Sequence, residues 1–283
     1  MLRENAGKLQ VASIVKNEPL AHDVYHITLS APKLAADARP GQFVMVKVAP
    51  GLEPALRRPF SLHRFDGEAG QVEFIYQVVG RGTDILTNRV AGEEIELFGP
   101  LGNGFCLEKG SRIGLVGGGM GIAPLLAAAE EISRLGREVV TFLGAKTGDY
   151  LLTTKDFAAL GPLYLTTDDG SAGDKALVTK PLLDYLENKK LDLILACGPT
   201  PMLRALSKLA NEGGIPTQLS LEERMGCGTG VCLGCATAIR ADTPEGYTYK
   251  RVCHDGPVFW ARDVLFSVPD KITAKGGCDH GQG

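Results

Sequence analysis

The chain has 283 residues, and at about 150 residues per domain this length predicts two domains. Hydrophobic residues at 44% and charged residues at 22% are ordinary for a folded protein, which excludes a disordered chain. The net charge of -3 gives no electrostatic basis for binding DNA or RNA. The outlier is Gly, with 36 residues and no collagen-like period, so the excess needs a local explanation.

Neither a membrane span nor a secretory signal is expected. The long uncharged stretch 113–129 contains five glycines and Pro124, which a membrane span would not carry. The first ten residues include charges and lack an apolar run, unlike a signal peptide. We therefore expect a cytoplasmic protein without a membrane span and without nucleic acid as a partner.

The first hundred residues alternate short β-rich runs with turns. The runs are 9–16, 24–29, 42–48, 72–79 and 94–98. This spacing predicts an antiparallel barrel, which we place in residues 1–106.

After residue 110 the pattern changes to that of a parallel α/β sheet. Apolar runs at 113–116, 139–143, 163–166 and 191–196 alternate with helical patterns at 124–135, 178–188 and 201–212. We assign this domain to residues 107–218. From Leu219 onward helical periodicity is absent and cysteines appear among glycines, so residues 219–283 are predicted to form a small third module with a disordered tail at 275–283.

Three cysteines of this module, Cys227, Cys232 and Cys235, are separated by four and then two residues, and Cys253 follows after 17 more. This is the plant-type ferredoxin spacing, so the four thiols are the candidate ligands of a 2Fe-2S cluster. Neighbouring glycines allow the loop to wrap tightly and to point N–H groups at sulfur.

Two other interpretations of the cysteines remain. Structural zinc usually takes paired C-x2-C motifs, and only Cys232 and Cys235 form one. The thiols could also be buried and inert. Cys106 and Cys278 receive no role, and the five scattered histidines show no metal-ligand spacing; His254 is noted only as the neighbour of Cys253.

The barrel domain contains two anion-binding patterns. The run Arg57–Arg58–Pro59–Phe60–Ser61 follows a predicted strand, and Gly80–Arg81–Gly82–Thr83 precedes a short helical stretch at 84–90. An arginine and a glycine-led helix start can both hold a pyrophosphate. Taken alone, the motif leaves an ordinary turn at Arg58 as the alternative.

The α/β domain has two candidate nucleotide loops. A glycine run with Gly118, Gly119, Met120 and Gly121 lies between a strand and a helix, although it does not match G-x-G-x-x-G. A later strand ends in Cys197, Gly198 and Pro199. Ligands of open α/β sheets bind beyond the carboxyl ends of the strands, so both loops should share one crevice, with Cys197 facing a nicotinamide. Simple turns are the alternative for both.

The order of these motifs, with GPLGNGF at 99–105 and KRVCHDGPVF at 250–259, resembles the ferredoxin-NADP reductase superfamily. Within it, the chain is similar to the electron-transfer subunits of class 1B dihydroorotate dehydrogenases. The resemblance implies FAD in the barrel, the 2Fe-2S cluster on the four cysteines, and NAD at the crevice. It also implies contacts to FAD from Arg58, Pro59, Phe60, Ser61, Ile75, Tyr76, Gln77, Gly82 and Thr83, with Phe60 stacked on the flavin.

The resemblance further implies a partner, an FMN-containing dihydroorotate dehydrogenase catalytic subunit of pyrimidine biosynthesis, in a heterotetramer. The chain would pass electrons from that FMN through the cluster and FAD to NAD+. Residues 143–146 carry no arginine cluster for a 2′-phosphate, which favours NAD over NADP.

Alternatives are a reductase subunit of sulfite reductase or hydrogenase type, a transhydrogenase small subunit, and a zinc-stabilised nucleotide sensor. In the transhydrogenase family an Asp typically occupies the position of Cys227.

Overall fold

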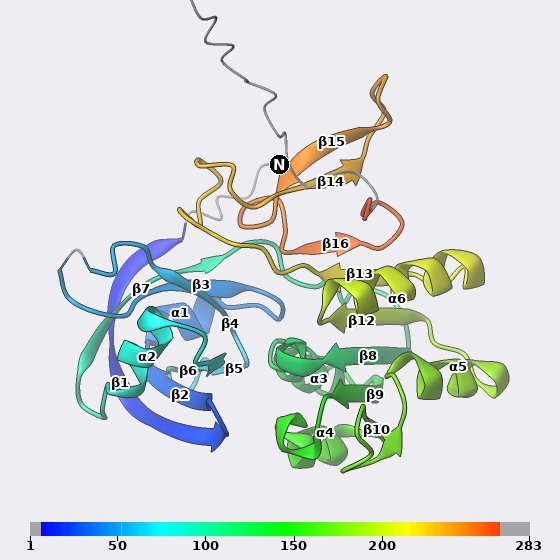
Figure 1. Cartoon of the computed structure of the whole chain (residues 1–283), viewed down its shortest axis with the longest axis horizontal. Coiled ribbons are helices and arrows are strands. Elements are labelled where there is room, and N and C mark those ends of the chain that lie inside the picture. The colour runs from blue at the N-terminus through cyan, green and yellow to red at the C-terminus, as the bar shows by residue number, and fades with distance from the viewer. Residues whose placement is uncertain (1–6, 52, 267–283) are drawn as a thin grey trace, which may run out of the picture.

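The computed structural model describes residues 7–51 and 53–266, which form three parts. An antiparallel sheet of the N-terminal third lies on the left of Figure 1, a parallel sheet with helices on the right, and a small hairpin above them. The predicted architecture of a barrel followed by a parallel α/β sheet is confirmed. The predicted disordered tail and Cys278 lie outside the described residues.

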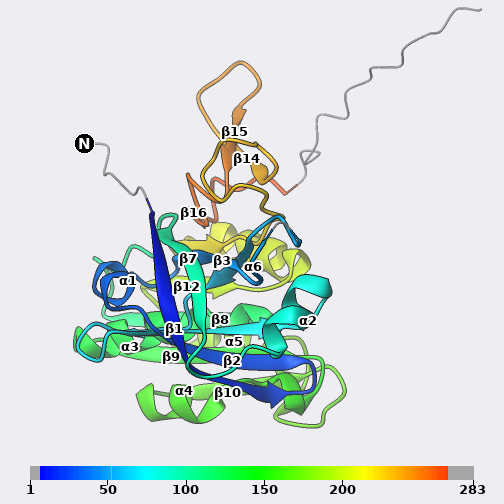
Figure 2. The same ribbon diagram turned by 90° about the vertical axis from the view of Figure 1, so that its left-hand side faces the viewer.

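The first sheet has seven strands in the order β4-β3-β7-β1-β2-β6-β5, all antiparallel to their neighbours. It curls until Phe60 of β4 stacks on Phe74 of β6, with ring centroids 4.7 Å apart. Figure 2 shows the long β1 crossing this barrel. The strands are β1 (Lys8–Ala21), β2 (Val24–Ser30), β3 (Phe43–Lys47), β4 (Arg58–Ser61), β5 (Arg64–Asp66), β6 (Gln71–Gln77) and β7 (Glu94–Leu101).

Two short helices cover the barrel. In α1 (Pro32–Asp37), proline stands in the first turn, where a missing N–H costs no helical hydrogen bond. In α2 (Arg81–Thr87), the hydroxyl of Thr83 accepts hydrogen bonds from the N–H groups of Val79 and Gly80 at 3.0 and 3.3 Å, which closes the turn before the helix.

The second sheet has the order β11-β10-β9-β8-β12-β13-β16, parallel except for the last strand. Its central strands are continuous apolar runs because helices cover both faces. The strands are β8 (Arg112–Gly118), β9 (Glu138–Ala145), β10 (Leu163–Thr167), β11 (Asp174–Lys175), β12 (Leu193–Cys197), β13 (Thr217–Ser220) and β16 (Val258–Trp260).

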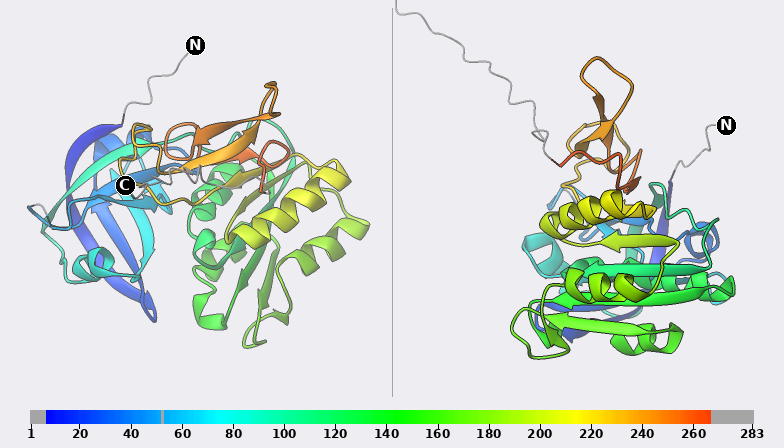
Figure 3. Two further views of the ribbon diagram at one scale, coloured as in Figure 1. Left: turned by 45° about the horizontal axis from the view of Figure 1, so that its top comes forward. Right: turned by 90° about the vertical axis from the view of Figure 1, so that its right-hand side faces the viewer.

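Alternate side chains of this sheet enter two cores. Leu115 of β8 packs with Leu126 of α3 and Phe157 of α4, whereas its neighbour Val116 packs with residues of α5 and α6 such as Leu206. Figure 3 shows α5 and α6 on the outer face. The helices are α3 (Leu125–Arg134), α4 (Thr154–Leu160), α5 (Thr179–Asn188) and α6 (Thr200–Gly213), and two 3-10 turns are η1 (Gly119–Ile122) and η2 (Gly148–Tyr150).

The cysteine module contains one antiparallel hairpin, β14 (Ala236–Arg240) and β15 (Tyr247–Arg251). The chain then returns to the second sheet, where β16 pairs with β13. Figure 3 shows this module running across the top of the barrel and the sheet. No helix within residues 7–51 and 53–266 is long and apolar enough to cross a membrane.

Several predicted boundaries differ from the structure. Residues 58–61 do not merely follow a strand but form β4 themselves, and α2 begins at Arg81 instead of residue 84. The domain boundary placed after residue 218 falls inside β13. Strand β16, which lies in the predicted third module, pairs with β13 and so belongs to the second sheet. Only long-range pairing reveals this, because a three-residue strand has no periodic signal.

Candidate functional site

Two neighbouring parallel strands, β8 and β12, end side by side at the switch point of the second sheet. Their chain order reverses here, since β9 and β10 extend to one side and β13 to the other. Gly117 of β8 pairs with Cys197 of β12. Gly121 in η1 lies against the end of β12: an added Cβ would be 2.3 Å from the carbonyl oxygen of Cys197. The predicted glycine run and the Cys197 turn thus meet, as expected for a ligand crevice.

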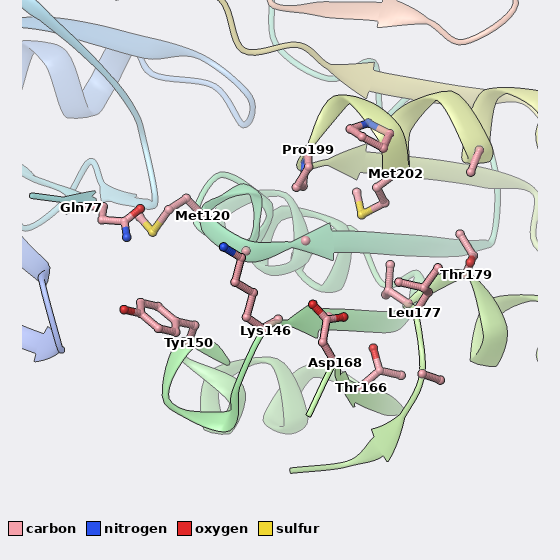
Figure 4. A pocket seen from close by; sticks show the side chains of 18 residues that line it. Gln77, Met120, Lys146, Tyr150, Thr166, Asp168, Leu177, Thr179, Pro199 and Met202 are labelled. Carbon is pink, nitrogen blue, oxygen red and sulfur yellow. The ribbon is translucent and has the colours of Figure 1, made fainter. Parts of the chain in front are cut away.

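A cavity of about 480 Å³ opens at this edge (Figure 4). Five predicted site residues line it: Gln77, Gly118, Gly119, Met120 and Pro199. In Figure 4, Gln77 approaches from the barrel and Met120 from the end of β8 and η1, residues 118–122, which we call the glycine turn. The structure therefore brings a residue of the first domain to the nucleotide crevice of the second.

Further lining residues, which were not among the predicted contacts, include some at the ends of β9 and β10 and one in η2. Lys146 directly follows β9, Asp168 directly follows β10, and Tyr150 ends η2. The available signal was their position, because the carboxyl ends of adjacent parallel strands meet at one edge. Asp23 of the β1–β2 turn accepts hydrogen bonds from Tyr150 Oη and Gln77 Nε2, both at 3.1 Å, and so joins the two domains at the cavity.

Cys197, Gly198 and Gly121 are not among the residues that line the cavity. The Cys197 side chain is fully buried, and its thiol donates to Oε1 of Glu222 at 3.8 Å. Burial, and secondly the carboxylate of Glu222, raises the pKa of this thiol well above its ordinary value. Cys197 is therefore a protonated thiol, and Glu222, which the sequence analysis did not single out, is its partner.

Strand β4, which holds four of the predicted flavin contacts and is called the flavin strand below, presents alternate residues to opposite sides. Arg58 and Phe60 pair with the barrel-core residues Val46 and Val44 of β3, whereas Pro59 and Ser61 pair with Met45 and Phe43. Phe60 is buried, and its ring lies parallel to Phe74 inside the barrel. Its stacking on a flavin remains a prediction.

Arg58 and the start of α2, the two predicted anion-binding patterns of the barrel, lie against each other. A Cβ added to Gly82 would lie 2.6 Å from Nε of Arg58, so only glycine allows the guanidinium this close to the helix start. The hydroxyl of Thr83 caps the turn that leads into this helix start. The structure therefore brings together the two patterns from which the sequence analysis expects anion binding.

The predicted flavin-side residues of β6 also divide between two environments. Tyr76 lies in the barrel core, where its hydroxyl donates to Oδ1 of Asn17 at 3.0 Å. Burial raises the pKa of Tyr76, so it stays a neutral phenol. Ile75 instead packs into the core of the second sheet, and Gln77, on the same side of β6, reaches the cavity.

The four predicted metal ligands come together as two pairs. The N–H of Cys232 donates to Sγ of Cys227 at 3.4 Å, and the N–H of Cys253 donates to Sγ of Cys235 at 3.4 Å. Further donors are the N–H of Thr229 to Cys227 at 3.4 Å and the N–H of Gly230 to Cys253 at 3.1 Å. Two pairs of thiols with amide donors fit a cluster that takes two ligands on each of two irons.

The two pairs lie in different surroundings. Cys235 and Cys253 are buried, whereas Cys232 is exposed. Burial raises the pKa of the Cys253 thiol, whereas at Cys227 burial is outweighed by hydrogen bonds from Thr229 and Cys232, which lower the pKa. Within residues 7–51 and 53–266, no group of three or more His, Cys, Asp or Glu side chains is arranged to hold one metal ion.

The cysteine loop lies directly against the barrel. A Cβ added to Gly228 would be 2.6 Å from Cγ of Met45, and Met45 is the β3 partner of Pro59 in the flavin strand. Asn103, just after β7, donates through Nδ2 to the carbonyl oxygens of His254 at 3.3 Å and Asp255 at 3.0 Å. The predicted cluster loop and the predicted flavin strand are thus one strand apart.

Comparison with known proteins identifies relatives of both regions. A family model described as the iron-sulfur cluster binding domain of dihydroorotate dehydrogenase B matches residues 222–265, and one described as the oxidoreductase NAD-binding domain matches residues 115–208. The dihydroorotate dehydrogenase B (NAD(+)) electron transfer subunit of Bacillus caldolyticus is 42% identical over 259 residues, covering 89% of this chain and 97% of the relative. The corresponding subunit of Caldanaerobacter subterraneus is 40% identical over 255 residues, covering 90% and 98%.

Solved structures show the same architecture. A structure of NADH-dependent reduced ferredoxin-NADP oxidoreductase, described in terms of flavin-based electron bifurcation, has a TM-score of 0.81, 34% identity and 90% coverage of both chains. A ferredoxin NADP+ reductase from Neisseria gonorrhoeae with bound FAD and NADP has a TM-score of 0.62 at 19% identity, covering 73% of this chain and 92% of that one. The second likeness concerns the fold alone.

Proposed function

This chain belongs to the family of electron-transfer subunits of dihydroorotate dehydrogenase B, and on that premise we propose how its residues carry electrons to NAD+. The chain is an NAD-linked oxidoreductase subunit with FAD and a 2Fe-2S cluster. The observation that supports the route is the contact of Gly228 with Met45, which places the cysteine loop one strand from β4. Electron transfer requires such a short path.

We assign the two thiol pairs as cluster ligands, Cys227 with Cys232 and Cys235 with Cys253. Amide donors from Thr229, Gly230 and the ligand residues reach three of the four sulfurs, and such bonds stabilise thiolates. The buried pair faces the protein and the exposed Cys232 faces outward. A cluster held by these thiols would thus be open to a partner on the side of Cys232, and its buried ligands would lie on the side of Met45.

Arg58 and the start of α2 at Gly82 and Thr83 would hold the flavin's pyrophosphate, and Pro59, Ser61 and Gln77 lie on the outward side of their strands. A bound flavin exchanges both single electrons and a hydride, which neither a cluster nor NAD does alone. The chain accordingly places the flavin strand between the cysteine loop and the nucleotide crevice.

The cavity beyond β8, β9 and β10 takes NAD. Gly118 and Gly119 let the main chain approach the pyrophosphate, and Asp168 stands where it can accept hydrogen bonds from ribose hydroxyls. A carboxylate there repels a 2′-phosphate, although Lys146 would attract one. We expect a higher kcat/KM with NADH than with NADPH, and the reverse ratio would contradict this assignment.

The partner is an FMN-containing catalytic subunit that oxidises dihydroorotate. Val231 and Leu233 flank Cys232, and with relative exposures of 80% and 63% they form an apolar surface beside the outer thiol. We propose that the catalytic subunit docks here and that the assembly is a heterotetramer. Thiolate ligands persist in a reducing compartment, so we propose a cytoplasmic location.

The test is co-expression with the catalytic subunit encoded by the same organism. The purified complex, under anaerobic conditions, should reduce NAD+ only when dihydroorotate is added. Cys232→Ser should abolish this reaction while NADH still reduces FAD in the chain, and Cys106→Ser, an exposed thiol outside the loop, should change neither. A complex that forms, carries all cofactors and transfers no electrons from dihydroorotate to NAD+ would refute the proposal.

A second candidate has support from the ferredoxin-NADP oxidoreductase structure at 34% identity. In that role the chain would exchange electrons with a ferredoxin-dependent flavoprotein. Reduction of ferredoxin by NADH and NADPH with the chain's native partner, without any reaction of dihydroorotate, would identify this alternative.

A further inference from the structure

A buried histidine, His63, lies at the junction between the barrel and the second sheet and has no role in the cofactor assignments above. Only 1% of its surface is exposed. Its Nδ1 lies 2.6 Å from the carbonyl oxygen of Ala123, the residue that follows η1. The ring also meets the ring of His26 edge-on, with centroids 5.8 Å apart. Nε2 of His26 is in turn 2.8 Å from Oε2 of Glu73.

The hydrogen bond fixes the chemical form of this ring. A carbonyl oxygen only accepts, so Nδ1 of His63 carries the proton and donates. Burial is the largest effect on the His63 pKa and lowers it to about 4, so the ring is neutral near pH 7. The contact is therefore a neutral donor to a backbone acceptor.

The position of this bond in the chain connects both cofactor cradles. His63 is two residues after Ser61, the end of the flavin strand β4, and Ala123 is three residues after Met120, which lines the nucleotide cavity. The N–H of Ala123 also donates to the carbonyl oxygen of Met120 at 3.1 Å. A shift at Ala123 therefore moves the glycine turn itself.

A second attachment follows immediately. Arg64 donates through Nε to Oε1 of Glu130 on α3 at 2.7 Å and through its terminal nitrogen to Oδ1 of Asp156 on α4 at 3.0 Å. Adjacent residues thus hold α3 at two places, just before its first turn and in its second. Two attachments restrict rotation as well as distance.

We propose that His63 is a positioning residue for hydride transfer, whose Nδ1–H to Ala123 bond sets the glycine turn at a fixed distance from the flavin strand. This rests on the proposed exchange between FAD and NAD in this chain. Hydride transfer depends steeply on the separation of donor and acceptor, so a small displacement costs roughly tenfold or more. Lys146 and Asp168, at the ends of β9 and β10, line the cavity outside the glycine turn, so the affinity for NADH depends on them as well.

Three substitutions test the contribution of the Nδ1–H group alone. His63→Asn places an amide N–H where Nδ1–H lies, His63→Gln places it near Nε2, and His63→Leu removes it. The full chain with FAD and cluster is mixed with NADH anaerobically, and the rate of flavin reduction at saturating NADH is measured by stopped flow. The long-wavelength charge-transfer absorbance between flavin and nicotinamide gives a second readout that does not depend on turnover.

We expect His63→Gln to reduce flavin at least tenfold more slowly, with a weakened charge-transfer band and a Kd for NADH within about threefold of wild type. His63→Leu should behave the same where it folds. His63→Asn should stay within about twofold of wild type in rate and keep the band. Equal rates in the Asn and Gln variants, or loss of NADH affinity without loss of rate, would overturn the proposal.

Arg134→Gln is the control, because it removes an exposed ion pair within α3, to Glu131, without touching the barrel. It should match wild type in every readout. Failure of the wild-type chain to reduce FAD with NADH would refute the proposed function, whereas a normal wild type with unaffected His63 variants refutes this inference alone.

Discussion

The environment of a single side chain in this protein depends on the side of the strand on which it lies. In β4, Arg58 and Phe60 pair with Val46 and Val44 of the barrel core, and Ser61 points to the other side. The sequence motif alone does not reveal this division, because it gives the residue types and not the side of the strand on which each side chain lies. At the cysteines the motif is more informative, since the spacing itself dictates which thiols can converge.

Acid should destabilise the protein through His63. The unfolded chain binds a proton near pH 6.5, whereas the folded chain keeps the ring neutral until about pH 4, because burial lowers its pKa. Stability is therefore unaffected above pH 6.5 and falls as the pH drops from 6.5 toward 4. Between pH 7.5 and pH 5 the wild type should lose about 2 kcal/mol more than His63→Asn.

The measurement is the urea dependence of unfolding for both proteins at the two pH values. His26, Glu73 and Arg64 surround the ring in both and cancel in the comparison. An identical pH dependence of stability in wild type and variant would show that folding does not lower the pKa of His63.

At the scale of elements, the sequence predicted what depends on local pattern. The strands β8 and β12 are apolar runs with glycines beyond them, so their ends and the shared crevice were predictable. The edge strand β4 was not, because Pro59 interrupts it, and proline is tolerated there since an edge needs fewer N–H donors. The pairing of β16 with β13 depends on residues about forty positions apart, which local periodicity does not encode.

The contact between η1 and β12 makes Gly121 sensitive to substitution. In Gly121→Ala the new Cβ would meet backbone atoms of Cys197 and Gly198 at 2.3–2.4 Å, so one of the two elements has to move. We expect a loss of stability of about 1–3 kcal/mol and a weaker binding of NAD, because the crevice itself is displaced.

Calorimetric NAD titration and the thermal midpoint of the Gly121→Ala protein check this expectation. Gly67→Ala is the control, since Gly67 lies in an exposed turn where the nearest atom to an added Cβ is 3.9 Å away. An unchanged NAD affinity in Gly121→Ala would mean that the two loops do not jointly form the nucleotide site.

Across the whole molecule, the cysteine module contacts both larger domains. Gly228 meets Met45 of the barrel, and the segment after Cys253 enters the second sheet as β16. The N–H of Leu221 donates to the carbonyl of Pro257 at 2.9 Å, and that of Ala261 to the carbonyl of Thr217 at 2.8 Å, which locks this segment onto β13. The module is thus part of the sheet's edge.

Removing the cluster should therefore loosen the second sheet and leave the barrel intact. Ligation holds Cys235 and Cys253 together, and β16 begins only five residues after Cys253, so loss of iron releases a segment that covers β13. The test uses protein from which the iron has been removed by a chelator under anaerobic conditions while FAD is retained. Amide hydrogen exchange at β13 and β16 should then accelerate roughly tenfold, which corresponds to a fall of about 1.4 kcal/mol in the opening free energy. Exchange in β1 and β2 serves as the internal control, because both strands pair with strands of the barrel sheet and should keep their rates. Acceleration in β1 equal to that in β13 would indicate general unfolding, and unchanged exchange at β13 would show that the sheet's edge does not depend on the cluster.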